Sequence, residues 1–157
     1  ASLIKLFVML AAYRADSLDY FEADDFGYSI NQMISASSND RMNLLVDELG
    51  GIDRVNELIE PFGFADTRLN KYLEKGKNDP GTAENVTSVT DCAKLLHAIY
   101  KGELISQTES AKMLGFLMQQ ENREKIPAAL PSGTKVAHKT GEYVDEACHD
   151  AAIVYTG

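Results

Sequence analysis

Residues 3–15 constrain the fold most, because apolar side chains lie on every side of a helix built from them. A surface helix shows a single apolar stripe, whereas a helix that is apolar all round is buried. The most apolar part, residues 6–12, is far shorter than the ~20 residues of a membrane span. It lies between Lys5 and Arg14, and no small-residue cleavage site of the signal-peptide kind follows it. We therefore expect a central helix that other elements cover.

Helical periodicity and start signals predict further helices along most of the chain. Ser88 with Asp91, and Ser106 with Glu109, have the Ser-x-x-acid spacing that begins a helix. Periodicity fails over residues 63–84, where Gly, Pro, Asn and Asp predict a long loop. The predicted helices are 28–35, 42–49, 52–59, 88–100 and 106–118, and the predicted strands are 134–139 and 151–155, joined by a polar connection at 141–149.

The order of elements, helices followed by a β-hairpin, predicts an α+β fold (α/β in the wider sense). Residues 1–131 form the mostly helical region and residues 132–157 form the hairpin of an antiparallel sheet. A lone two-stranded hairpin is marginal in water. We therefore expect that flanking parts of the domain are missing from this sequence or that a second chain completes the sheet.

Composition excludes some partners. The formal net charge is −9, and the 15 basic residues form no stripe, which argues against nucleic acid. No segment is long and apolar enough to span a membrane. Neither Cys92 nor Cys148 has a CxxC neighbour, so we expect free thiols and no metal site.

Ser2 and Lys5 form a Ser-x-x-Lys motif, which places a hydroxyl and an amine one helical turn apart. Serine needs a base within hydrogen-bond reach to act as a nucleophile. A free lysine is protonated because its pKa is about 10.4, and burial would lower that value. Taken alone, the motif is more often plain helix surface.

Ser37 and Asn39 form a Ser-x-Asn motif where one helix ends and the next begins. Serine and asparagine both favour helix starts, so a simple cap is the ordinary interpretation. The functional interpretation gives Ser37 a proton-shuttle role toward a leaving group and Asn39 a hydrogen bond to a substrate amide.

Lys139, Thr140 and Gly141 end the first predicted strand. They could be an ordinary strand end with a turn glycine, or a strand edge that pairs with an extended substrate. Lys139 and Thr140 would then bind a carboxylate, and Gly141 would admit the substrate close to the backbone. A phosphate-binding loop is excluded, because His138 stands where that motif requires glycine.

The three motifs occur in the order and on the elements of the signature set of class A β-lactamases and penicillin-binding proteins. Nearly the whole chain resembles class A β-lactamase-type sequences, notably at 1–6, 43–45, 50–51, 126–131 and 149–154. The resemblance implies the β-lactamase/transpeptidase-like fold. It also implies that Ser2 attacks a β-lactam or a peptidyl-D-Ala-D-Ala carbonyl and that Lys5 takes or relays the proton. The backbone N–H groups of Ser2 and Glu142 would form the oxyanion hole, and no cofactor is expected.

The sequence departs from this family in three places. Class A enzymes carry a glutamate in the long loop that activates the deacylating water, and Leu73 stands at that position here. Glu74 is the only nearby acid and is one residue displaced, so we expect slow deacylation if it cannot reach the ester. The stretch between Ser2 and Ser37 is short, and the family's N-terminal strands and its C-terminal strand and helix are absent.

Other polar residues are predicted to be structural. His97, His138 and His149 have no triad partner that spacing identifies, and Asp24 and Asp25 are predicted to be solvated. The alternatives to a β-lactamase are a D-alanyl-D-alanine peptidase, a slow penicillin-binding protein, and a non-catalytic β-lactam-binding or sensor domain. Secretion, or a periplasmic or extracellular location, is expected by resemblance alone.

Overall fold

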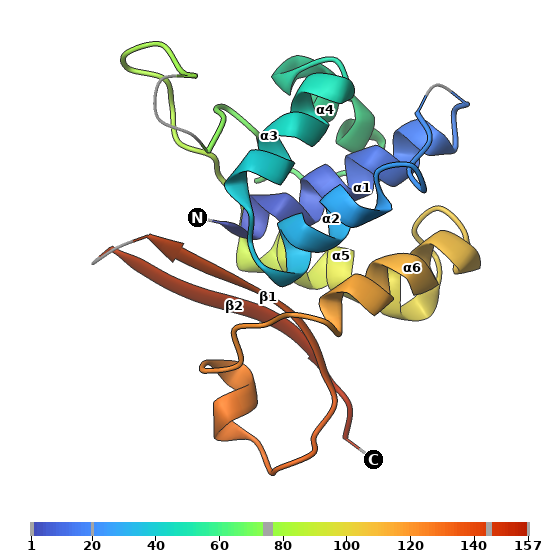
Figure 1. Ribbon diagram of the computed structural model, residues 1–157, viewed down its shortest axis with the longest axis vertical. Coiled ribbons are helices and arrows are strands. Elements are labelled where there is room, and N and C mark those ends of the chain that lie inside the picture. Colours follow the sequence, from blue (N-terminus) through green and yellow to red (C-terminus); the bar gives the residue numbers. More distant parts are fainter. Residues whose placement is uncertain (1, 20, 74–76, 144–145, 157) are drawn as a thin grey trace.

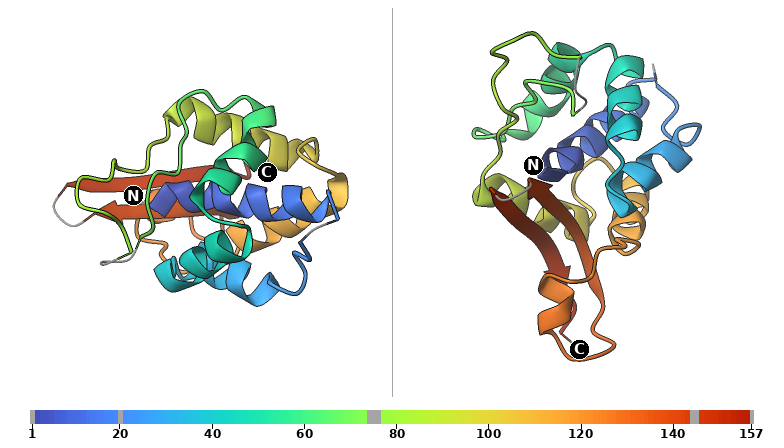
Figure 2. Two further views of the ribbon diagram at one scale, coloured as in Figure 1. Left: turned by 90° about the horizontal axis from the view of Figure 1, so that it is seen from above. Right: turned by 60° about the vertical axis from the view of Figure 1, so that its left-hand side comes forward.

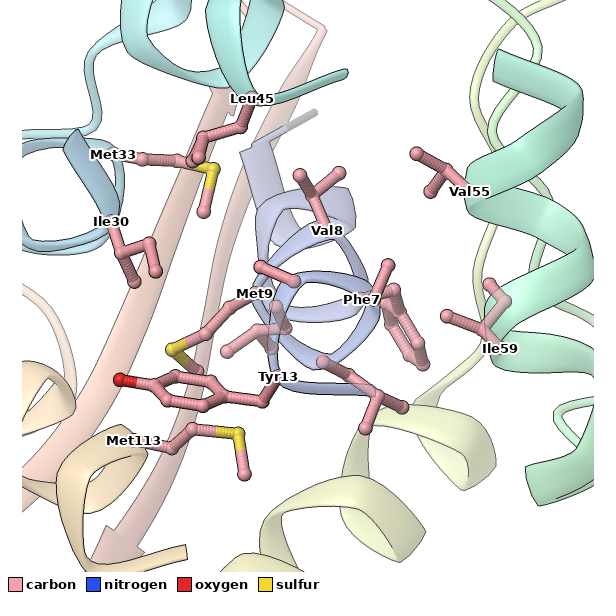
Figure 3. Close-up of a cluster of buried hydrophobic side chains, with 14 of the residues drawn as sticks. Phe7, Val8, Met9, Tyr13, Ile30, Met33, Leu45, Val55, Ile59 and Met113 are labelled. Carbon is pink, nitrogen blue, oxygen red and sulfur yellow. The ribbon is translucent and has the colours of Figure 1, made fainter. Parts of the chain in front are cut away.

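The computed structural model describes residues 2–19, 21–73, 77–143 and 146–156. A 3-10 turn, η1 (Ser2–Ile4), leads into the central helix α1 (Lys5–Asp16), as expected from its apolar surface. Lys5 through Tyr13 are all buried. Figure 3 shows α1 end-on inside a ring of side chains from the surrounding helices, among them Met33, Leu45, Ile59 and Met113.

Helices cover α1 on several sides (Figure 1). α2, α3 and α4 follow α1 in the chain and pack against it, and α5 and α6 pack on each other and on the hairpin strands. The bounds are α2 (Gly27–Ser35), α3 (Asn39–Glu48), α4 (Ile52–Ile59), α5 (Val89–Lys101) and α6 (Gln107–Leu117), with 3-10 turns η2 (Glu60–Phe62) and η3 (Ile126–Ala129). The predicted starts hold: the Ser88 and Ser106 side chains accept from the N–H groups of Asp91 and Glu109.

The hairpin is longer than the sequence predicts. β1 (Val136–Tyr143) and β2 (Ala147–Val154) pair antiparallel, so much of the expected polar connection at 141–149 belongs to strands. The physical reason is that polar side chains of these strand ends find protein partners: Glu142 accepts from Asn122, and Asp150 bonds His138. Within the described residues the sheet has these two strands.

The start of α1 lies against the sheet. η1 contacts both β1 and β2, and Figure 2 shows the N-terminal end of the chain beside the strands. The fold thereby brings residues 2–5, the α2–α3 junction and β1 to one place. Of the described helices, none has the length and apolar character that a membrane span requires.

Candidate active site

Lys5 lies at the centre of the candidate site. Its side chain is fully buried, and its Nζ lies 3.1 Å from Ser2 Oγ. Two shorter hydrogen bonds run from Nζ to the backbone oxygen of Ser37 at 2.6 Å and to Asn39 Oδ1 at 2.7 Å. The structure therefore brings together the Ser-x-x-Lys and Ser-x-Asn motifs, which are more than 30 residues apart in the sequence.

The chemistry of these partners orients Lys5. A carbonyl oxygen and an amide oxygen only accept hydrogen bonds. A neutral amine has two N–H groups, and these two acceptors engage both. Its lone pair is then left for the Ser2 hydroxyl, whose oxygen lies 3.1 Å away. In this form Lys5 is placed to accept a proton from Ser2.

At the junction between α2 and α3, one residue caps the helix and its two neighbours contact Lys5. Ser38 is the helix cap, and its side chain accepts from the Arg41 N–H. Ser37 has a φ of 58°, in the left-handed region that non-glycine residues seldom adopt. Both its carbonyl and its hydroxyl lie within hydrogen-bond distance of Lys5 Nζ. The capping interpretation thus holds for the middle residue of the motif, while Ser37 and Asn39 are directed to Lys5.

Lys139 reaches the same point from β1. Its side chain is fully buried, and Nζ donates to Ser37 Oγ and to the Thr140 carbonyl, each at 2.8 Å. Ser37 Oγ therefore lies between two lysines, 3.4 Å from Lys5 Nζ and 2.8 Å from Lys139 Nζ. A hydroxyl in this position can accept a proton from one side and donate one on the other.

Burial lowers the pKa of both lysines. Desolvation brings the pKa of Lys5 to about 8. Desolvation, followed by the nearby positive charge of Lys5, brings the pKa of Lys139 to about 7. Two ammonium groups that share one hydroxyl repel each other. When one of the two lysines loses its proton, the protonated form of the other lysine is therefore stabilised.

The free edge of β1 carries the Glu142 amide. The Tyr155 N–H donates to the Lys135 carbonyl, so residues 135 and 155 form a hydrogen-bonded pair. Along the two strands such pairs alternate with non-hydrogen-bonded pairs. Thr140 and Glu142 therefore belong to non-hydrogen-bonded pairs, and their backbone N–H and C=O groups point away from β2. This is the orientation that an oxyanion donor at Glu142 and an edge for an extended substrate both require.

Ser2 lies between two hollows. One, of about 370 Å³, runs toward Gln120 and Glu121, and the other, of about 330 Å³, runs toward residues 71–73 of the long loop. Ser2, Asn39 and Glu142 line both hollows. A substrate carbonyl at Ser2 would thus have room on each side of the bond under attack.

The loop wall of the second hollow is held by amide side chains. Asn85 Oδ1 accepts from the N–H groups of Asn70 and Lys71, and buried Asn43 accepts from the Leu73 N–H at 3.1 Å. Leu73 lines the hollow beside Ser2. Glu74, the expected displaced acid, lies outside the described residues.

Several polar groups near the site were not predicted from the sequence. Lys125 Nζ donates to the carbonyls of Gly141 and His149 and forms an ion pair with Glu142. His138, for which spacing gives no partner, bonds Asp150 through Nδ1 at 2.9 Å. The hairpin register would have revealed this pair, because Asp150 stands opposite Thr140, two residues from His138.

The cysteines and Asp24 lie away from the lysines of the candidate site. Cys92 and Cys148 are free thiols, as predicted. Asp24, predicted to be solvated, is exposed and also pairs with Lys112. Among the described residues, no group of three or more His, Cys, Asp or Glu side chains could hold a metal ion.

Solved structures share the fold of this chain. A β-lactamase from Sphaerobacter thermophilus matches 98% of this chain and 68% of its own with a TM-score of 0.84 at 25% identity. The penicillin-binding protein PBP-A matches 99% of this chain and 66% of its own with a TM-score of 0.85 at 25% identity. A leucine-to-glutamate variant of PBP-A, solved as an acyl-enzyme complex with penicillin G, has a TM-score of 0.81. The fold is that of the β-lactamases and penicillin-binding proteins.

Sequence comparison gives the family. The model of the beta-lactamase enzyme family matches residues 27–157. The extended-spectrum β-lactamase PER-1 from Pseudomonas aeruginosa is 26% identical over 127 residues, which are 77% of this chain and 41% of the relative. A β-lactamase from Proteus vulgaris is 27% identical over 135 residues, or 82% of this chain and 50% of the relative. The chain belongs to the beta-lactamase enzyme family and resembles its class A serine enzymes, although it spans half or less of the length of these two relatives.

Proposed function

We propose that the protein carrying this chain is a serine hydrolase of class A β-lactamase type, acylated at Ser2 by β-lactams. One observation carries the proposal: Lys5 Nζ lies 3.1 Å from Ser2 Oγ while its two shortest hydrogen bonds go to oxygens that only accept. Neutral Lys5 takes the Ser2 proton as Oγ attacks the β-lactam carbonyl. The N–H groups of Ser2 and Glu142 bind the resulting oxyanion.

Breaking the ring C–N bond requires a proton on the departing nitrogen. Ser37 Oγ, 3.4 Å from Lys5 Nζ, supplies that proton and is reprotonated from Lys5. Asn39 holds Lys5 through its amide oxygen, and its NH2 group donates a hydrogen bond to the substrate amide in the proposed complex. The product of this half-reaction is an ester between Ser2 and the opened β-lactam.

The carboxylate of the substrate binds Lys139 and Thr140, and Gly141 admits it to the edge of β1. An anion beside Lys139 favours its protonated form, and a cationic Lys139 in turn favours a neutral Lys5. Substrate binding therefore selects the protonation states that acylation needs.

Deacylation is the slow half of the proposed reaction. Leu73, which lines the hollow beside Ser2, has no group that activates water. Glu74 is the only acid proposed for this role, and its neighbour Leu73 is tied through its N–H to Asn43. We expect the acyl-enzyme on Ser2 to accumulate during reaction with penicillins.

Intact-protein mass spectrometry with benzylpenicillin tests the proposal. A lasting adduct that maps to Ser2 and is absent in the Ser2→Ala variant is the expected result. Rapid turnover with no adduct would support acylation and contradict slow deacylation. The absence of both adduct and turnover in correctly folded protein would contradict the proposed function.

A second candidate is a D-alanyl-D-alanine peptidase or a slow penicillin-binding protein, favoured by Leu73 and by the likeness to PBP-A. Release of D-alanine from a diacyl-Lys-D-Ala-D-Ala peptide, with no hydrolysis of a chromogenic cephalosporin, would select it. A sensor domain would bind β-lactams without releasing D-alanine or hydrolysing the cephalosporin. The substrates of all three candidates are small molecules found outside the cytoplasm, which is why we propose a periplasmic or secreted location.

A further inference from the structure

His138 and Asp150 form a buried pair directly behind the Lys-Thr-Gly segment. His138 is fully buried, and its Nδ1 lies 2.9 Å from Asp150 Oδ1 and 3.2 Å from Oδ2. The Asp150 side chain is 3% exposed, and its Oδ2 also accepts from the Ile126 N–H at 3.1 Å. Among the described residues, His138 Nε2 is buried with no hydrogen-bond partner.

The strand register ties this pair to the substrate-binding residues. His138 immediately precedes Lys139, and Asp150 is the cross-strand neighbour of Thr140. Side chains of a non-hydrogen-bonded pair share a face and lie close together. Asp150 is therefore joined to β1 by its hydrogen bond with His138, the residue before Lys139, and to η3 by the hydrogen bond from the Ile126 N–H.

The charged groups around Lys139 shift its pKa in different directions, and Asp150 acts from the other face of β1, because its partner His138 and Lys139 are successive residues of the strand. Burial comes first, and the positive charges of Lys5 and Lys125 also lower the Lys139 pKa, while the carboxylates of Asp150 and Glu142 raise it. Glu142 is exposed and already paired with Lys125. Asp150 is thus the buried carboxylate that offsets the positive charge of Lys5 and Lys125 at Lys139.

We propose that Asp150, held by His138, is a positioning residue that favours the cationic form of Lys139 when the carboxylate of the substrate binds. This inference rests on the proposed function, because it concerns the anion subsite of the same reaction. A neutral Lys139 would still donate to Ser37 and Thr140, but it would not attract an anion. Asp150 acts through Lys139 and does not touch the substrate.

The experiment compares a penicillin with its methyl ester, which lacks the negative charge. Second-order acylation rate constants at pH 7.5 give an acid-to-ester preference for each variant. Asp150→Asn keeps the size of the side chain, and its single amide oxygen can still accept from the Ile126 N–H, but the variant lacks the charge and the second acceptor oxygen. We expect its preference to fall about tenfold, as for one unit of pKa. Asp24→Asn, which removes an equal charge from an exposed ion pair with Lys112, is the matched control and should leave the preference unchanged.

A second variant separates the charge of Asp150 from its hydrogen bond with His138. His138→Asn retains an N–H donor for Asp150 and leaves the carboxylate in place, so its preference should stay within about twofold of the wild type. An unchanged preference in folded Asp150→Asn, or a tenfold loss in His138→Asn, would overturn the inference. A wild-type protein that forms no Ser2 adduct with acid or ester would instead contradict the proposed function.

Discussion

Lys139 Nζ donates a hydrogen bond of 2.8 Å to Ser37 Oγ, although 102 positions separate the two residues. This bond joins β1 to the α2–α3 junction across the candidate active site. The same hydroxyl lies 3.4 Å from Lys5 Nζ, so the protonation of either lysine affects the other.

The acylation rate should rise with pH as Lys5 loses its proton. With a pKa of about 8, about a tenth of Lys5 is neutral at pH 7 and about half at pH 8. We therefore expect the second-order rate constant for acylation by a penicillin methyl ester, which carries no negative charge that would shift the pKa of Lys5, to increase about fivefold over this interval and to level off above it. Stopped-flow or quenched mass spectrometry would measure this, and a flat profile from pH 6.5 to 9 would refute Lys5 as the base.

Stability should also rise with pH, because the folded protein holds fewer protons on these lysines than the unfolded chain. The folded-state pKa values of Lys5 and Lys139 are about 8 and about 7, below the unfolded value of ~10.4. The two lysines destabilise the folded protein most at pH values below their folded-state pKa values. This destabilisation declines as the pH rises toward the unfolded-state pKa. We expect the free energy of unfolding to increase by about 1–3 kcal/mol per pH unit near pH 8–9.

Urea titrations at pH 7.5 and 9 measure this slope. The window ends near pH 9, because burial raises the pKa of Cys92 and adds an opposite dependence above it. In the Lys139→Met variant the slope should be smaller than in the wild type. An equal slope in both proteins would show that Lys139 keeps its ordinary pKa in the folded state.

Substitutions of the neighbouring serines Ser37 and Ser38 should have different effects, the first on acylation and the second on stability. Ser38→Ala removes the cap of α3 and should cost about 1 kcal/mol of stability with little change in acylation. Ser37→Ala removes the hydroxyl between the two lysines and should slow acylation about 100-fold. Ser37→Gly is the control for the left-handed backbone, because glycine adopts a φ of 58° without strain. If Ser38→Ala were the slower of the two alanine variants, the assignment of roles would be wrong.

Placing a carboxylate at position 73 should shorten the life of the acyl-enzyme. Leu73 lines the hollow beside Ser2, and Leu73→Glu introduces a base there for a water molecule. We expect deacylation to accelerate at least about tenfold. Leu73→Gln, of similar size but without basicity, is the matched control, and equal deacylation by both variants would contradict a general-base effect.

The local elements were largely predictable from the sequence. The all-round apolar surface of residues 3–15 predicted the central helix, and Ser88 and Ser106 begin helices as expected. The strand bounds were wrong at the hairpin end. Polarity there predicted a connection, but Glu142 and Asp150 find side-chain partners, and the backbone ladder continues through them.

The sequence by itself determined which reactive groups this protein contains and in what order, because the three motifs are each local and short. The tertiary structure decided what these groups do to one another. The depressed pKa of Lys5 arises from burial in the folded core. The hydrogen bond from Lys5 to the Ser37 carbonyl joins α1 to the α2–α3 junction, and the bond between His138 and Asp150 joins two strands. Hydrogen bonding and desolvation are properties of positions in space, and sequence spacing fixes such positions only within one helix or one strand.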